Sequence, residues 1–190
     1  MNTAVRFSIS VPTVRNLGRG RRWSSMEAGS RNKQRKVGLM IYLKAFFAGF
    51  VSTLVFHQGV LWLLYAGGFL PRAPWNMTPV PPLSSATAVI SLAFWGGVWG
   101  IVLWALISAS TGSAYWIRAL VIGALGPSLI AWFVVMPIKS MGFAGGWDPK
   151  IIVGALLLNG AWGLGVALLM RLLNRVILPN EMTTPEKING

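Results

Sequence analysis

Four long stretches of the chain consist almost entirely of apolar residues and contain no acid, Lys or Arg. They cover about residues 45–66, 86–107, 119–138 and 151–170. A helix of roughly 20 such residues crosses the ~30 Å hydrocarbon core of a bilayer. The stretches are apolar on every side rather than on one helical face, which is typical of helices surrounded by lipid and by other helices. The predicted fold class is therefore an all-α membrane protein with four transmembrane helices.

The apolar stretches divide the chain into three parts. Residues 1–38 are basic and rich in Arg and Ser, residues 39–175 form the transmembrane domain, and residues 176–190 form a short polar tail. The first part has too little apolar surface to fold alone, which predicts a disordered cytoplasmic tail. Its composition also fits an organellar transit peptide. Either Met26 or Met40 would equally begin a sensible membrane protein, so the start of translation stays open.

The positive charge lies mainly at one set of helix ends. The formal net charge is +13, and most basic residues precede the first span, with Arg118, Arg171 and Arg175 at the matching ends of the later spans. The positive-inside rule then places both termini and the 108–118 loop in the cytoplasm. Attraction to anionic lipid headgroups explains the basic tail, so nucleic acid is not expected as a partner.

The two halves of the transmembrane domain resemble each other. Residues 42–49 and 116–123 both read aromatic, aliphatic, basic, Ala, three apolar residues and Gly, and residues 97–100 resemble 160–163. This indicates two duplicated helical hairpins related as parallel repeats. The match is short, so a chance likeness of composition is the alternative.

Glycines gather on the second and fourth spans. Small residues let membrane helices approach closely, which drives much of their association. The residues predicted to serve this packing are Gly96, Gly97, Gly100, Gly160 and Gly163, with Gly165 beside them. Because they occur beside Trp in both spans, we expect spans two and four to pack together along the bundle axis. Glycines that simply face lipid are the alternative.

A small set of polar residues interrupts the apolar spans. Gly49, Thr53 and His57 repeat at i, i+4 and i+8 and share a helix face. Counted from Ala45 at ~1.5 Å per residue, His57 lies ~18 Å into the hydrocarbon core. The candidate intramembrane polar cluster consists of Gly49, Ser52, Thr53, His57, Gln58 and Asn159.

Two interpretations of His57 follow. In the structural one, which we favour, a neutral imidazole donates a hydrogen bond to a carbonyl, a hydroxyl or Asn159. In the functional one, His57 handles a proton or a substrate, because polar groups inside a bilayer often line such paths.

Catalytic and metal chemistry find little support in the sequence. The chain has no cysteine and one histidine, and the spans contain no carboxylate, so neither a metal site nor a cofactor site is predicted. No nucleophile motif or phosphate-binding glycine motif is present, and we expect no enzyme activity.

Two segments rich in proline are predicted to shape the bundle. Residues 69–83 form an extended connector that either links two helices stiffly or folds back over the bundle mouth. Pro127 should kink the third span, where Ser128 could satisfy the freed carbonyl.

Three runs carry a resemblance to known proteins. Residues 56–59, 71–82 and 94–100 together resemble small integral membrane proteins of bacteria that have no known activity, over residues 40–173. The resemblance implies the bacterial inner membrane and no particular cofactor. The predicted function is an assembly or accessory component that binds a second copy or another membrane protein. The alternative is a small oligomeric transporter or channel with the polar stripe of the first span along its path.

Overall fold

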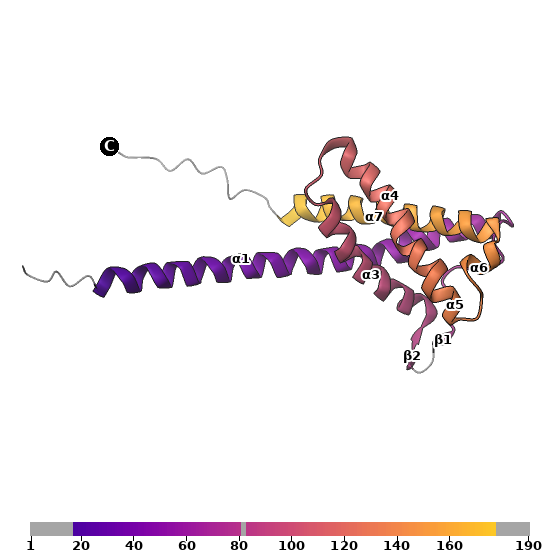
Figure 1. The fold of residues 1–190 in the computed structure, drawn as a ribbon, viewed down its shortest axis with the longest axis horizontal. Helices are drawn as coiled ribbons and strands as arrows, with labels where there is room; N and C mark the ends of the chain where they lie inside the picture. Colours follow the sequence, from indigo (N-terminus) through magenta and orange to yellow (C-terminus); the bar gives the residue numbers. More distant parts are fainter. Residues whose placement is uncertain (1–16, 81–82, 178–190) are drawn as a thin grey trace, which may run out of the picture. The chain divides into compact units, whose positions relative to one another are not determined.

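The computed structural model of the chain describes residues 17–80 and 83–177 (Figure 1). It is mostly helical, and four of its helices are long and apolar enough to cross a membrane. They cover Arg35–Ala66, Ala88–Ile107, Gly112–Ile138 and Pro149–Arg175. The prediction of four such helices is therefore confirmed. The first three end where the predicted spans end, but the first and third begin several residues earlier than predicted.

Several elements build these four helices. The first contains α1 (Leu17–Ser52), the π-helical η1 (Thr53–His57) and α2 (Gln58–Ala66), and the second is α3 (Ala88–Ile107). The third contains α4 (Gly112–Ile130), the π-helical η2 (Ala131–Val135) and α5 (Met136–Ile138), and the fourth is α7 (Pro149–Ile177). The short α6 (Ala144–Trp147) precedes α7.

The basic segment differs from its predicted form. Helix α1 begins at Leu17, so much of residues 1–38 is helical where a disordered tail was predicted. The segment has no proline after Pro12, and it is rich in Arg, which favours helix once the apolar span has nucleated it. The described chain divides into two units between Met40 and Ile41, and the bundle below is the second unit. The predicted polar tail beyond Ile177 lies outside the described residues.

A small two-stranded sheet accompanies the helices. Strand β1 (Pro79–Val80) pairs antiparallel with β2 (Leu83–Thr87), with Pro79 opposite Thr87. The hairpin lies in the proline-rich connector, whose residues favour extended backbone over helix. It leads directly into α3, where the N–H of Ala88 donates to the carbonyl of Thr78 at 2.9 Å.

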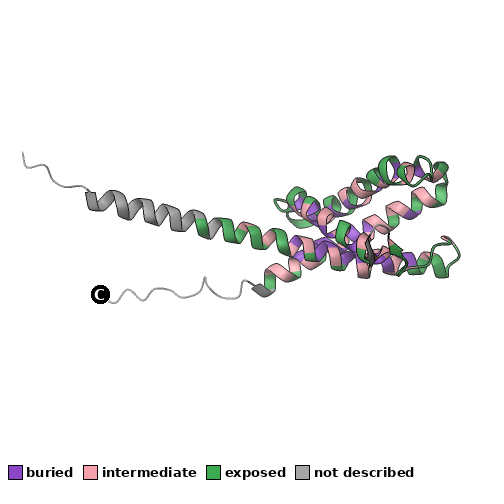
Figure 2. Cartoon of the chain, turned by 90° about the horizontal axis from the view of Figure 1, so that it is seen from below, coloured by how far each residue is buried: buried purple, intermediate pink, exposed green. Residues whose placement is uncertain are grey.

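The core lies where the four helices cross, and the outward faces are exposed (Figure 2). Small residues dominate the contacts, which lets the helices approach one another closely. The buried cluster contains Ala45, Ala48, Leu103, Ile107, Tyr115, Ala119, Trp162, Val166, Ala167 and Met170.

Two helix pairs cross backbone to backbone. In the first crossing, α1 meets α3, and a Cβ on Gly100 would lie 2.5 Å from the Ala45 oxygen and 2.9 Å from the Gly49 Cα. In the second crossing, α4 meets α7, and a Cβ on Gly163 would lie 2.9 Å from the Gly123 Cα and would also strike the Ala119 oxygen. Only glycine fits at these contacts.

The pairing of spans differs from the predicted one. The predicted packing glycines face odd-numbered spans: Gly96 meets Gly49 and Thr53, Gly97 meets the ring of Phe46, and Gly160 meets Leu120. The contact between α3 and α7 is much smaller than that between α4 and α7. The reason is geometric. Spans one and two, and spans three and four, are adjacent antiparallel helices, so their small residues contact each other rather than those of a more distant span.

The bundle has two ends, which we name by what lies there. The termini end holds residues 41–44, the 108–111 loop and the last turns of α7. The loop end holds the segments 67–87 and 139–148. Leu70 packs against Gly154, 3.1 Å from a Cβ built on the glycine, and this contact joins the 67–87 segment to the start of α7.

Candidate functional site

The polar residues of the first crossing bind backbone rather than one another. Ser52 is fully buried, and its Oγ donates to the Trp162 carbonyl at 2.7 Å. In return, the Trp162 indole Nε1 donates to the Gly49 carbonyl at 3.0 Å. The Thr53 hydroxyl donates to the same Gly49 carbonyl at 3.0 Å. The bonds between Ser52 and Trp162 and between Trp162 and Gly49 fasten α1 to α7, whereas the Thr53 bond stays within the first span.

Asn159 lies in a different contact from the other predicted cluster members. Its Nδ2 donates to the Ser128 Oγ at 2.9 Å, which joins α7 to α4. Ser128 is fully buried and follows Pro127. The polar cluster predicted from sequence is therefore split between two helix interfaces.

The connector after α2 folds back onto the first span. The Trp75 N–H donates to the Gln58 Oε1 at 2.8 Å, and the Trp75 indole Nε1 donates to the Leu54 carbonyl at 3.1 Å. Of the two forms expected for this connector, the structure has the one that folds back. The Leu54 carbonyl lies in the wide turn of η1, where π-helical geometry changes which backbone carbonyls have partners along the helix. Gln58, whose side chain is the other acceptor, follows this turn directly.

Trp75 itself is held in an unusual conformation. Its φ is 48°, in the left-handed region that large side chains seldom adopt. Such a conformation costs of order 1–3 kcal/mol and persists only where other contacts hold it. The two hydrogen bonds to the first span supply those contacts.

His57 lies beneath this connector and lacks the hydrogen bond that the favoured interpretation required. Its Nδ1 is buried and has no hydrogen-bond partner among the described residues. A buried polar atom without a partner is costly and calls for an explanation, such as a water or a ligand.

The neighbours of His57 show where it lies along the bundle. Ala45 contacts Gly100, which lies ~10 Å from the end of α3 at ~1.5 Å per residue, so Ala45 is already inside the bundle. At the other end, Asn76 next to Trp75 accepts a hydrogen bond from Val89 in the first turn of α3. His57 therefore lies in the half of the first span that is nearer the loop end, and its depth in a bilayer stays a prediction.

We define the His57 site as Leu54, His57, Gln58 and Trp75. Its imidazole nitrogen is free to donate to or accept from a small polar ligand or water. The described residues contain no group of three or more His, Cys, Asp or Glu side chains that could hold a metal ion. Sequence reasoning missed the Leu54 carbonyl and its bond with Trp75, because a backbone acceptor in a π-helical turn leaves no mark in the sequence.

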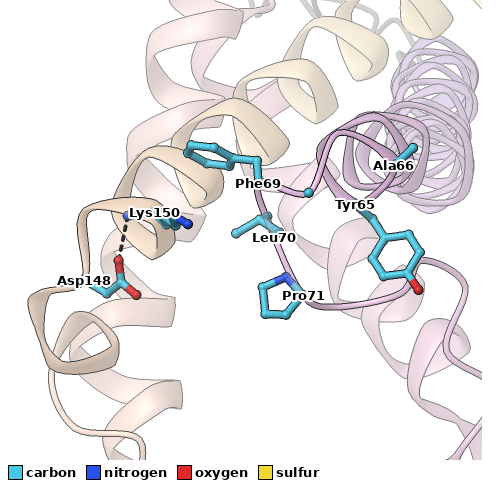
Figure 3. Close-up of a pocket in the computed structure, with 8 residues that line it drawn as sticks. Tyr65, Ala66, Phe69, Leu70, Pro71, Asp148 and Lys150 are labelled. Carbon is cyan, nitrogen blue, oxygen red and sulfur yellow. Dashed lines mark hydrogen bonds between the residues drawn. The ribbon is translucent and has the colours of Figure 1, made fainter.

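A hollow of about 690 Å³ also opens at the loop end (Figure 3). Tyr65, Phe69, Leu70 and Pro71 line it from the end of α2, and Asp148 and Lys150 line it from the start of α7. The Asp148 Oδ1 accepts the N–H of Lys150 at 2.8 Å and so caps α7, with Pro149 between them. This carboxylate therefore has a structural role already, as expected of an Asp just before a helix.

Comparison of the chain with protein-family models, curated proteins and solved structures finds no match.

Proposed function

We propose that the chain is an integral protein of the bacterial inner membrane that crosses it four times, with both termini in the cytoplasm. Four helices of sufficient length and hydropathy support the crossings. The basic residues at the termini end support the orientation through the positive-inside rule. The chain has no native cysteine, so single cysteines at Met77 and Ser113 allow a clean test by membrane-impermeant labelling. Labelling at 113 from outside would contradict the orientation.

The two crossings support an internal duplication. Residues 45 and 49 contact Gly100 in the first crossing as residues 119 and 123 contact Gly163 in the second. These pairs are the ones that the sequence repeat aligns. The two hairpins then run in the same direction, as parallel repeats do.

The function we propose is that of an assembly or accessory component of the membrane, without catalytic activity. The observation that carries it is the use of the buried polar groups. Ser52 and Trp162 form bonds that fasten α1 to α7, and the Thr53 hydroxyl is engaged by the Gly49 carbonyl of its own span. Backbone contact at both crossings leaves these helices close together, which suits a rigid scaffold better than a solute path.

An outward-facing group of aromatic residues is the place where we expect a partner. The aromatic ridge consists of Phe47, Phe94 and Trp95, which are 60%, 51% and 59% exposed, arranged around Phe46. Large aromatic side chains contribute strongly to protein–protein contacts.

Crosslinking in native membranes tests the assembly role. Single cysteines replace Trp95 on the ridge and, as a matched control, Val102 on another exposed part of α3. We expect a crosslinked adduct at 95 and little at 102, with its mass telling a second copy from a different protein. Equal adducts at both positions, or none at either, would contradict assembly through the ridge.

Transport is the second candidate function, and the His57 site favours it. An unpaired buried imidazole nitrogen beneath a strained connector is the kind of group found on ion or substrate paths. Proton flux into proteoliposomes, measured with a pH-sensitive dye for wild type and His57→Gln, tests this. Flux that depends on His57 would place transport first, and absence of flux would leave the assembly role.

A further inference from the structure

An arginine at the termini end is stacked on a rigid aromatic platform. The Arg171 guanidinium lies 4.7 Å from the Tyr115 ring centre and 5.0 Å from that of Trp116. Tyr115 is buried, and its hydroxyl donates to the Ala167 carbonyl at 2.8 Å, one helical turn before Arg171. The two rings contact each other edge to face, with centres 5.5 Å apart. The cation is thus held in a defined position at the junction of α4 and α7.

Among the described residues, this guanidinium is engaged by the two aromatic rings and by no hydrogen bond. Within residues 41–177, Asp148 is the one carboxylate, and it lies at the loop end, far from Arg171 along the length of α7. No acceptor for Arg171 lies within hydrogen-bonding distance in the part of the chain that the structure describes. Stacking occupies the faces of a guanidinium and leaves its N–H groups in the plane free for an anion.

A second arginine adds charge at the same end. Arg118 follows the platform on α4, and its Nη1 donates to the Ser110 Oγ at 2.8 Å, which directs it toward the termini end. Apolar side chains adjoin both arginines, since Ile117 is 60% exposed and Leu172 is 47% exposed. The surface therefore combines fixed cations with apolar flanks. A lipid matches this arrangement, because its phosphate and acyl chains lie together, whereas a free phosphate would use only the cations.

We propose that Tyr115, Trp116, Arg118 and Arg171 form a binding site for the phosphodiester of an anionic lipid. Arg171 contacts the phosphate, Arg118 adds charge, and the flanking apolar residues contact the acyl chains. The residues of the site all belong to the second unit of the chain. The site rests on the proposed function in so far as the chain must lie in a bilayer.

Retention of lipid by the full-length protein tests the site. Wild type, Arg171→Gln, Arg118→Gln and the control Arg72→Gln are placed in nanodiscs of phosphatidylcholine with a minority of phosphatidylglycerol. Arg72 is exposed at the loop end, so it controls for loss of one positive charge. Native mass spectrometry then measures the phosphatidylglycerol that stays bound after release. We expect Arg171→Gln to weaken binding about fivefold, Arg118→Gln to weaken it less, and Arg72→Gln to have no effect.

Each outcome has a definite meaning. Equal retention by wild type and Arg171→Gln, or equal loss in Arg72→Gln, would overturn the site. If Arg171→Gln does not fold, Arg171→Lys and Arg118→Gln test the site instead. Arg171→Lys keeps the positive charge and Arg118→Gln removes one, and neither leaves the aromatic platform without a cation. Inorganic phosphate that displaces the lipid at millimolar concentration would show a free-anion site and would overturn the lipid assignment. A chain that fails to enter nanodiscs at all would instead contradict the proposed membrane location.

Discussion

The two helix crossings share one backbone arrangement but differ in what surrounds it. In both, a glycine and an alanine of an odd-numbered span contact a glycine of an even-numbered span. The first crossing is tied to a third helix through Ser52 and Trp162. The second is tied internally through Asn159 and Ser128. Small residues thus set how closely two helices approach. Polar side chains determine whether the crossing is also hydrogen-bonded to a third helix.

Both hairpins carry a local irregularity. In the first, the π-helical η1 lies under the Trp75 connector, and His57 at its end has an unpaired nitrogen. The second hairpin has its own π-helical turn, η2, where the buried Trp132 Nε1 also has no partner among the described residues. A strained loop lies against η2 as well, since Ser140, Ala144 and Trp147 have positive φ and Trp147 packs against Phe133. We place the candidate site in the first hairpin because its unpaired nitrogen belongs to a histidine, which can exchange a proton.

The largest effect we expect comes from a methyl group in the first crossing. Gly49→Ala would place a Cβ against the Gly96 oxygen and 2.9 Å from the Gly100 Cα, neither of which can move away as a flexible side chain would. We expect a loss of about 3 kcal/mol in the free energy of unfolding, measured in mixed micelles. The control is Gly59→Ala, because nothing lies within 4 Å of a Cβ there. A similar loss at both positions would mean that helix propensity, and not the crossing, sets the cost.

The matching substitution in the second crossing sharpens the comparison. A Cβ on Gly123 would lie 2.7 Å from the Gly163 Cα, so we expect Gly123→Ala to cost nearly as much as Gly49→Ala. Gly126→Ala is the control, because its Cβ would meet only the Trp99 ring at 3.3 Å, which has room to shift. Tolerance of Gly123→Ala would show that the two crossings are not equivalent.

The four spans and the positions of the packing glycines were predicted from the sequence, but the contacts between the spans were not. Span lengths and the glycine positions are local properties, so hydropathy and spacing identified them. The partner of each glycine depends on three-dimensional packing, and the prediction that spans two and four pair was wrong for that reason. The start of the first span shows the same limit, because it was placed at Ala45 although Ala45 packs against Gly100 well inside α3.

A smaller effect is expected from the bond that ties the first crossing to α7. Trp162→Phe keeps the ring in place but removes the donor to the Gly49 carbonyl, which still accepts from Thr53. We expect a loss of about 1 kcal/mol. The double variant with Ser52→Ala should cost more than either alone but less than their sum, because both residues serve one interface. Strict additivity in a double-mutant cycle would contradict this coupling.

The starts of the returning helices differ between the two hairpins in a measurable way. Asp148 caps α7 through the Lys150 N–H, whereas Thr87 before α3 makes no such bond, and its buried Oγ1 has no partner among the described residues. We expect Asp148→Ala to destabilise the protein by about 1 kcal/mol, and Asp148→Asn to be tolerated. Thr87→Ala should change stability little. A larger loss at Thr87 would mean that its hydroxyl has a partner, such as water.

The smallest effect on stability is expected at His57 in the first hairpin. Variants of this residue also test whether its unpaired nitrogen has a function. An interhelical hydrogen bond from the imidazole would make His57→Leu cost ~0.5–2 kcal/mol. The Nδ1 has no such bond among the described residues, so we expect His57→Leu to be within about 0.5 kcal/mol of wild type, since removing an unpaired buried polar atom offsets the lost packing. His57→Gln should behave alike in mixed-micelle unfolding. If both variants stay stable yet lose a growth or flux phenotype, the nitrogen serves a ligand or proton. A clear loss of stability in His57→Leu that His57→Gln restores would instead show a structural bond, and the site would lose its main support.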